Sequence, residues 1–183
     1  MYELVKKQSS EYDKYEQVHD GQTWNYHIFC VVKNAIKFAK ERGGDVEIVE
    51  ISALFHDYAN LVDFEKYSEI HHIASGELAE PILREYGYSQ DFIDKVKKCI
   101  HSHRASVIKD KFSIEEICLA DADAITHIEN AFEIIMWQGQ RRYTIEQGNT
   151  FVKNKIKKSY AKLSDWAKEY IRDRYEAILR IFY

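Results

Sequence analysis

The spacing of apolar and polar residues along the chain predicts helices over most of its length. In five segments the apolar residues recur three or four positions apart, which is the pattern of one buried helix face. These segments are about 23–42, the stretch from Asp45 to His56-Asp57, about 68–86, the stretch that follows Ser89, and about 113–137. One or two further amphipathic helices are expected beyond Gly139, and the first ~20 residues are expected to form a short helix or arm.

Residues typical of helix ends support these boundaries. Gly43-Gly44 is expected to end the first segment, because glycine accepts the left-handed conformation found at helix C-termini. Ser113 and Glu116 have the pattern of a capping box, in which each side chain bonds the backbone of the other residue. Pro81 lies inside the third segment and predicts a kink or an early break there. The fifth segment is apolar nearly all round, which indicates a buried central helix.

Composition and charge narrow the class of protein. One proline and seven glycines in 183 residues make helix the default, so the sequence predicts an all-α protein with a single domain. The net charge of −4 argues against an extended nucleic-acid surface and against a polybasic membrane patch. No signal peptide or membrane-spanning run is recognisable, so a cytoplasmic location is expected. The cysteines are expected to be buried free thiols; they are Cys30, Cys99 and Cys118.

Several histidines fall on the apolar faces of the predicted helices. His27 lies one position before Ile28 on the first helix, and His71 and His103 continue the apolar faces of the third and fourth. His56 ends an apolar run and is followed at once by Asp57. Helix bundles build metal sites from side chains placed in this way.

A single histidine on an apolar face is usually a hydrogen-bonded core residue, and a buried aspartate can be a helix cap or the partner of a cation. Four such positions on four helices are harder to explain in this way, because each unpaired buried polar group lowers the stability of the fold by ~1–3 kcal/mol. A shared divalent ion would satisfy several of them together. Imidazole and carboxylate ligands suit Mn, Fe, Mg, Co, Ni or Zn, and such an ion can activate water for attack on phosphorus.

The order His27, then Phe55-His56-Asp57, then Ala122-Asp123 resembles the H…HD…D signature of the HD superfamily, whose members are mostly metal-dependent phosphohydrolases. Four further segments are similar to members of this family: 71–83, 100–104, Asp121-Ala122-Asp123 and 171–182. The resemblance implies one HD-type helical bundle over 1–183, with its metal site in the helix core. The core would span about 23–138 and the C-terminal helices about 144–182.

The resemblance also implies roles for individual residues. It assigns the first metal to four ligands, which are His27, His56, Asp57 and Asp123. Asp121 competes with Asp123 because it lies two positions away on the same helix, and the family pattern favours Asp123. A second metal, or the substrate phosphate, is expected to contact His71 or His72 together with His103 and Arg104. Helical phase favours His71 over His72, and His103 over His101.

Three positions depart from the small stand-alone bacterial members of the family. Three extra residues separate His19-Asp20 from Trp24, Cys30-Val31 replaces an Arg-Val pair, and 124–126 read Ala-Ile-Thr in place of Arg-Leu-Asp. These positions are expected near the substrate rather than among the ligands. The metal prediction therefore stands, but the resemblance does not identify the substrate.

The sequence thus favours a phosphohydrolase that acts on a small phosphate ester or anhydride, with a nucleotide as the leading substrate class. Asp57 is expected to anchor the metal and to bridge two ions if both are present, and Asp121 or His103 is expected to accept the proton from water. One alternative is an HD module that binds a nucleotide or a protein partner without turnover. Another is a di-iron oxygenase of the same fold. The sequence leaves metal identity, nuclearity and oligomeric state open.

Overall fold

The structure, a computed structural model, describes residues 1–105, 110–140 and 144–181, and the side chains of all of these except 137–140. All regular secondary structure in these ranges is helical, which confirms the predicted all-α class. The N-terminal elements are α1 (Tyr2–Tyr15), the π-helix η1 (Trp24–Ile28), α2 (Phe29–Arg42), α3 (Val46–Phe55), α4 (Tyr58–Val62) and α5 (Phe64–Tyr67). The remaining elements are α6 (His71–Glu85), α7 (Gln90–Ser102), α8 (Ile114–Glu129), α9 (Ala131–Gln140), α10 (Ile145–Lys162) and α11 (Asp165–Leu179).

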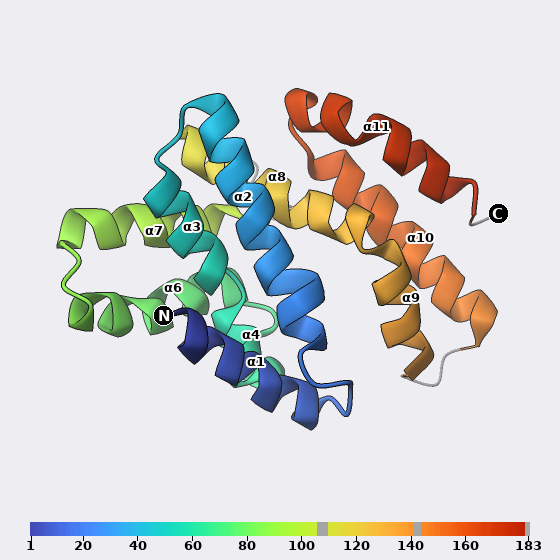
Figure 1. Cartoon of the computed structure of the whole chain (residues 1–183), viewed down its shortest axis with the longest axis horizontal. Helices are drawn as coiled ribbons and strands as arrows, with labels where there is room; N and C mark the ends of the chain where they lie inside the picture. Colours follow the sequence, from blue (N-terminus) through green and yellow to red (C-terminus); the bar gives the residue numbers. More distant parts are fainter. Residues whose placement is uncertain (106–109, 141–143, 182–183) are drawn as a thin grey trace.

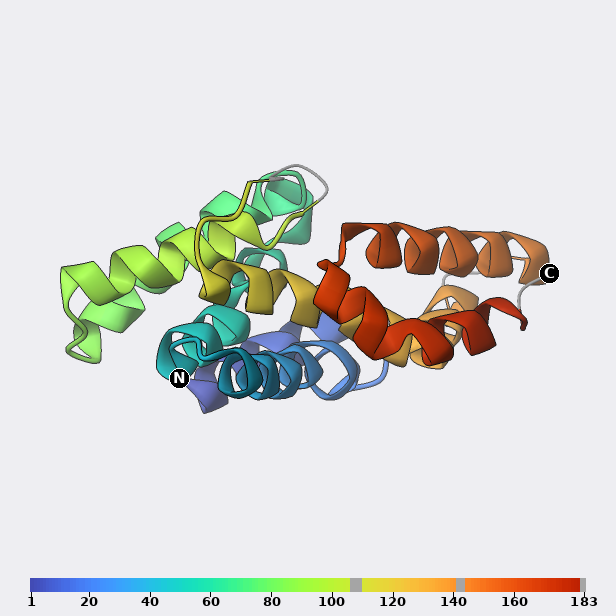
Figure 2. The same ribbon diagram turned by 90° about the horizontal axis from the view of Figure 1, so that it is seen from above.

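Helices α2, α3 and α8 form the centre of the molecule. Figure 1 shows α2 crossing next to α3 and α8, with the paired helices α6 and α7 on one side and α10 and α11 on the other. The view from above in Figure 2 shows the same order, with these two pairs at opposite ends of the molecule. The C-terminal pair therefore meets the rest of the protein mainly through α8.

The first predicted helix forms with the expected buried face. η1 and α2 continue directly into each other over Trp24–Arg42, and the apolar residues that recur at helical spacing along them are buried; they include Trp24, Ile28, Val31, Val32, Ala35 and Ala39. Gly43 ends α2 with a φ of 75°, the left-handed conformation expected there.

The predicted long central helix is in fact two helices. α8 ends at Glu129, and Asn130 adopts a non-helical φ of −103° and ψ of 35° before α9 begins. The Asn130 side chain donates a hydrogen bond to the backbone carbonyl of Tyr26, so it ties this break to η1. Asparagine favours such local breaks because its amide competes with the helix for backbone partners. The prediction of one helix to about residue 137 was therefore wrong.

Two other predictions about helix ends also need correction. Ser113 caps α8 by accepting from the Glu116 N–H, but the Glu116 carboxylate accepts from the Ser102 hydroxyl at 2.7 Å and does not complete a capping box. The buried Glu116 thereby links α8 to the end of α7. Pro81 does not break α6, which runs without interruption from His71 to Glu85. The predicted end of the last helix, at Phe182, lies outside the described residues.

The cysteines are free, as predicted, although only two of them are buried. Cys99 and Cys118 lie in the core, and burial raises the pKa of the Cys99 thiol to about 12. Cys30 is half-buried and donates to the backbone carbonyl of Asn25. None of the helices in the described part of the chain is both long and apolar enough to cross a bilayer.

Replacing Gly43 with alanine is expected to destabilise the protein. Its φ of 75° is unfavourable for a residue with a Cβ, although no neighbouring atom would obstruct that Cβ. The G43A variant should therefore lose about 1 kcal/mol of unfolding free energy in urea denaturation. K40A, at an exposed position in the same last turn of α2, is the control and should change by less than about 0.5 kcal/mol. Equal stability of G43A and the wild type would contradict this prediction.

Candidate metal centre

Four side chains from three separate parts of the chain meet at the centre of the bundle. His27 comes from η1, and the pair His56-Asp57 forms the turn between α3 and α4. Asp123 comes from the middle of the buried helix α8. The π-helix changes the side-chain direction at His27 relative to a regular α-helix, and π-turns of this kind are frequent at functional sites.

The donor atoms of these residues lie close together. His27 Nε2 is 3.1 Å from His56 Nε2, 3.2 Å from Asp57 Oδ2 and 3.7 Å from Asp123 Oδ1. His56 Nε2 is 3.5 Å from Asp57 Oδ2 and 4.0 Å from Asp123 Oδ1. One oxygen of each aspartate thus lies within 4.0 Å of both imidazole nitrogens. Two imidazoles and two carboxylates are a donor set expected for a transition metal or Mg. The structure thus brings together the four residues that the sequence analysis assigned to the first metal.

A second group of donors adjoins the first through Asp57. Its other oxygen, Oδ1, lies 3.6 Å from His71 Nε2 and 4.0 Å from His103 Nε2. The two oxygens of one carboxylate therefore face two different sets of imidazoles, one on each side. A carboxylate that bridges two metal ions presents its oxygens in the same way.

Backbone carbonyls hold three of the imidazoles in the form that binds metal. The Nδ1 atoms of His56 and His71 lie 2.7 Å and 2.8 Å from the carbonyl oxygens of the residues three positions earlier, and His103 makes the same contact. Because a carbonyl oxygen only accepts hydrogen bonds, each Nδ1 carries the hydrogen. Each Nε2 is then left with a free lone pair directed at Asp57 or Asp123, and such backbone contacts commonly orient metal-binding histidines.

The electrostatics of the cluster agree with this assignment. Burial lowers the pKa of His56 below its ordinary value and lowers the pKa of His103 to about 3, so both rings are neutral at pH 7. Burial alone would raise the pKa of Asp57, but the imidazoles of His56, His27 and His71 hold it well below its ordinary value. The pKa of Asp123 is lowered in the same way, by His127 first. Neutral imidazoles beside ionised carboxylates form the state that a divalent cation requires.

His127 is a member of the cluster that the sequence analysis missed. Its Nδ1 lies 3.9 Å from Asp123 Oδ1, and its ring stacks on His27 with centroids 5.2 Å apart and planes 18° apart. The spacing contained the signal, because residues four positions apart on a helix lie on the same face and His127 follows Asp123 by four.

Asp121 is not part of the cluster. Its carboxylate lies 3.2 Å from the Arg42 guanidinium and accepts from the Ser164 N–H and hydroxyl at 2.9 Å and 2.6 Å. It therefore connects α8 to the end of α2 and to the start of α11. The structure does not support the prediction that Asp121 accepts a proton from the reacting water.

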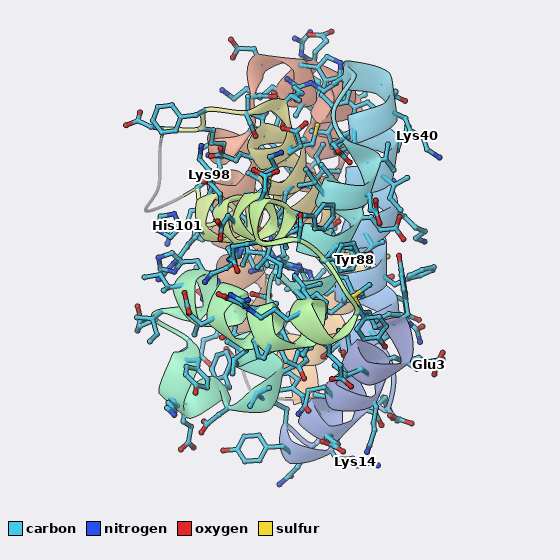
Figure 3. All side chains as sticks on the ribbon, turned by 90° about the vertical axis from the view of Figure 1, so that its left-hand side faces the viewer. Glu3, Lys14, Lys40, Tyr88, Lys98 and His101 are labelled. Carbon is cyan, nitrogen blue, oxygen red and sulfur yellow. The ribbon has the colours of Figure 1, made fainter. Side chains whose placement is uncertain are left out.

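The structure also separates the histidines between which the sequence left a choice. His71 and His103 belong to the cluster, whereas His72 packs against His101 with ring centroids 5.5 Å apart. Figure 3 shows His101 at the outer side of the molecule near Lys98. Arg104, expected to contact phosphate, donates to the carbonyl of Glu69 and lies 3.3 Å from its carboxylate.

A cavity of about 430 Å³ opens over the cluster. Its lining contains donors from both groups, and its other residues come from several segments, among them η1, α4, α5, α9 and α10. The wall residues that the sequence analysis did not select include Tyr26, Asn130, Glu133, Ile134, Phe151, Lys155 and Lys162. The sequence gives little indication that these residues line a cavity, because exposed lysines and aromatic residues at helical spacing usually have no role in a binding site.

The fold and the cluster together define an all-helical protein whose core can hold a divalent metal. A model of the HD domain family matches residues 25–128, and the chain belongs to this family. The match contains the four predicted ligands of the first metal as well as His71, His103 and His127. It ends before α9, so the C-terminal helices lie outside it.

Solved structures of similar proteins support the fold. YpgQ of Bacillus subtilis is 24% identical and superposes with a TM-score of 0.66, covering 100% of this chain and 94% of that protein. A predicted HD superfamily hydrolase from an uncultured Thermotogales bacterium is 23% identical, with a TM-score of 0.63, and the match covers 98% of this chain and 86% of that one. A further structure, YpgQ in complex with ADP, is 23% identical with a TM-score of 0.66, and the match covers 99% of this chain and 93% of that one. The comparison with curated proteins found no match.

The two neighbouring aspartates of α8 provide a direct test of the site. Asp123→Asn removes a charged donor from the cluster and should weaken Mn²⁺ binding at least roughly tenfold in a titration followed by calorimetry. Asp121→Asn should leave Mn²⁺ affinity unchanged but should lower the free energy of unfolding by about 2 kcal/mol, because charge-assisted bonds to Arg42 and Ser164 are lost. Loss of metal binding in D121N, together with unchanged binding in D123N, would reverse the assignment.

Proposed function

We propose that this protein is a metal-dependent phosphohydrolase that acts on a small phosphate ester or anhydride, with nucleotides as the substrate class. The observation that carries the proposal is the carboxylate of Asp57, which faces imidazole donors on both sides at the base of a cavity. Membership of the HD domain family supports hydrolase chemistry at the level of the superfamily.

We assign the first metal to His27, His56, Asp57 and Asp123, whose donor atoms converge. Asp57 would also contribute to a second metal, together with His71 and His103. When bound, a divalent ion supplies a Lewis acid for phosphate oxygens and makes nearby water more acidic. Mn, Fe, Mg, Co, Ni and Zn all fit a donor set of nitrogen and oxygen atoms.

His103 fits the role of a ligand better than that of a proton acceptor. With a pKa of about 3 its imidazole is a weak base at neutral pH, since the ideal general base has a pKa near the working pH. Its Nδ1 is already occupied by the Ile100 carbonyl, so only Nε2 is available, and Nε2 faces Asp57. We therefore propose His103 as a metal ligand rather than as the residue that accepts a proton from water.

A nucleotide as substrate is supported by the shape and lining of the cavity. A volume of about 430 Å³ is within the range of small-molecule sites. Its lining combines the polar residues of the proposed metal site with aromatic and apolar side chains, which include Tyr26, Ile134 and Phe151. A nucleotide has the same division between a charged phosphate end and a planar base. The similar protein YpgQ has been solved in complex with ADP.

The proposed function predicts hydrolysis after reconstitution with metal. Protein loaded with Mn²⁺, Co²⁺ or Mg²⁺ is expected to hydrolyse at least one member of a panel of nucleotides and generic phosphoesters, measured by phosphate or pyrophosphate release. His27→Ala removes a donor and should lower kcat/KM roughly a thousandfold or more. His101→Ala removes an imidazole outside the cluster and is the matched control.

Either of two results would contradict the proposed function. One is the absence of turnover by the wild-type protein on the whole panel with every metal, which would favour a binding module without catalysis. The other is equal activity of H27A and the wild type, which would locate the activity elsewhere.

The second group of donors predicts two metal ions per chain. Elemental analysis of the wild-type protein should find about two equivalents, and His71→Ala should reduce this to about one. His72→Ala is the control, because the neighbouring imidazole lies outside the cluster and its loss should leave both ions bound. A wild-type content near one equivalent would contradict the second site and would also argue against a di-iron oxygenase.

A further inference from the structure

One face of α10 is directed at the metal centre. Lys155, Ser159 and Lys162 are four and seven positions apart, so they lie along the same side of the helix. The buried Ser159 hydroxyl lies 3.4 Å from His127 Nδ1, which places this face beside the cluster. Lys155 and Lys162 both line the cavity. Figure 1 shows α10 running next to α8 and α9, the helices that contribute the adjoining walls.

Lys155 lines the same cavity as the aspartates of the cluster. The negative charges of Asp123 and Asp57 act to raise its pKa, whereas burial, the largest cause, lowers it below the ordinary value. Yet no carboxylate oxygen in the described residues lies within 4.0 Å of its ammonium group, and the same holds for Lys162. Other partly buried lysines do have such partners; Lys97, for example, pairs with Glu77 and Glu80.

The other cationic side chain described in the cavity wall is already engaged. Arg104 bonds the carbonyl and the carboxylate of Glu69. Lys155 and Lys162 are therefore the lining cations of the described chain that have no protein acceptor. A lysine that gives up part of its hydration without a partner raises the free energy of the empty site, and an anion in the cavity would offset this cost.

We infer that Lys155 and Lys162 bind a phosphate group of the substrate at the wall of the cavity that α10 supplies. The inference rests on the proposed function and adds to it that α10, which lies outside the segment matched by the HD domain model, supplies the phosphate-binding wall. Lys155 is assigned the larger role, because it lines the cavity that contains Asp57 and Asp123 and the charges of both aspartates act on it. The ligand is an anion with at least one phosphate group besides any that contacts the metal.

Binding of inorganic pyrophosphate to the Mn²⁺-loaded protein tests this inference without requiring turnover. In calorimetry, Lys155→Met should weaken pyrophosphate binding at least tenfold, and Lys155→Arg should recover much of the loss because it restores the charge. Lys158→Met is the matched control: it removes the same charge from the same helix at an exposed position, and it should change the affinity less than twofold. The Mn²⁺ content and melting temperature of each variant show whether the fold and the metal centre remain intact.

Lys162→Met provides a second, independent variant and should weaken pyrophosphate binding at least threefold, so the inference stays testable if K155M does not fold. The inference is overturned by unchanged affinity in both K155M and K162M, by an equal loss in the control K158M, or by the absence of pyrophosphate binding by the wild-type protein.

Measurements of turnover distinguish a failure of this inference from a failure of the proposed function. In nucleotide hydrolysis, K155M should raise KM at least tenfold and change kcat much less, because binding energy common to the substrate and the transition state is lost. If the wild-type protein hydrolyses nothing but its pyrophosphate binding depends on Lys155, the proposed function fails and the inference stands. If hydrolysis occurs with a KM that is the same in K155M and the wild type, the proposed function stands and the inference fails.

Discussion

The carboxylate of Asp57 is the feature on which the rest of the site depends. One oxygen lies among the imidazoles of His27 and His56, and the other faces His71 and His103. Asp57 occupies the turn between α3 and α4 rather than a helix interior, and its two oxygens point in different directions; Oδ1 also accepts a hydrogen bond from the Asn60 amide of α4 at 3.1 Å. Burying this charge is costly unless cations or hydrogen-bond donors surround it. The helices that deliver the four histidines therefore have to meet at this turn.

Three of the histidines are positioned by the ends of helices. His56 and His103 are the C-caps of α3 and α7, and His71 is the first residue of α6. Each donates from Nδ1 to the carbonyl of the residue three positions earlier, so the backbone itself sets the tautomer and the ring orientation. Orientation of the donors by the backbone reduces the entropy that is lost when a ligand is bound.

The C-terminal helices complete the site from outside the segment that matches the family. Asp121 joins α8 to Arg42 at the end of α2 and to Ser164 at the start of α11. Ser159 of α10 reaches His127 beside the cluster. These contacts position α10 at the cavity, so a helix outside the matched segment forms part of the wall around the proposed metal ligands.

The sequence by itself determined the helical class, because helical periodicity is a local property of the chain. It also indicated the four residues of the first donor group, because the H…HD…D signature can be recognised from the order of residues alone. Only the tertiary structure decided between Asp121 and Asp123. A helix turns about 100° per residue, so side chains two positions apart point in widely different directions, and packing against other helices determines which one meets the histidines. The break at Asn130, the contribution of His127 and the position of Lys155 depend likewise on contacts between distant segments. Local spacing does not reveal which surface of one helix another will cover.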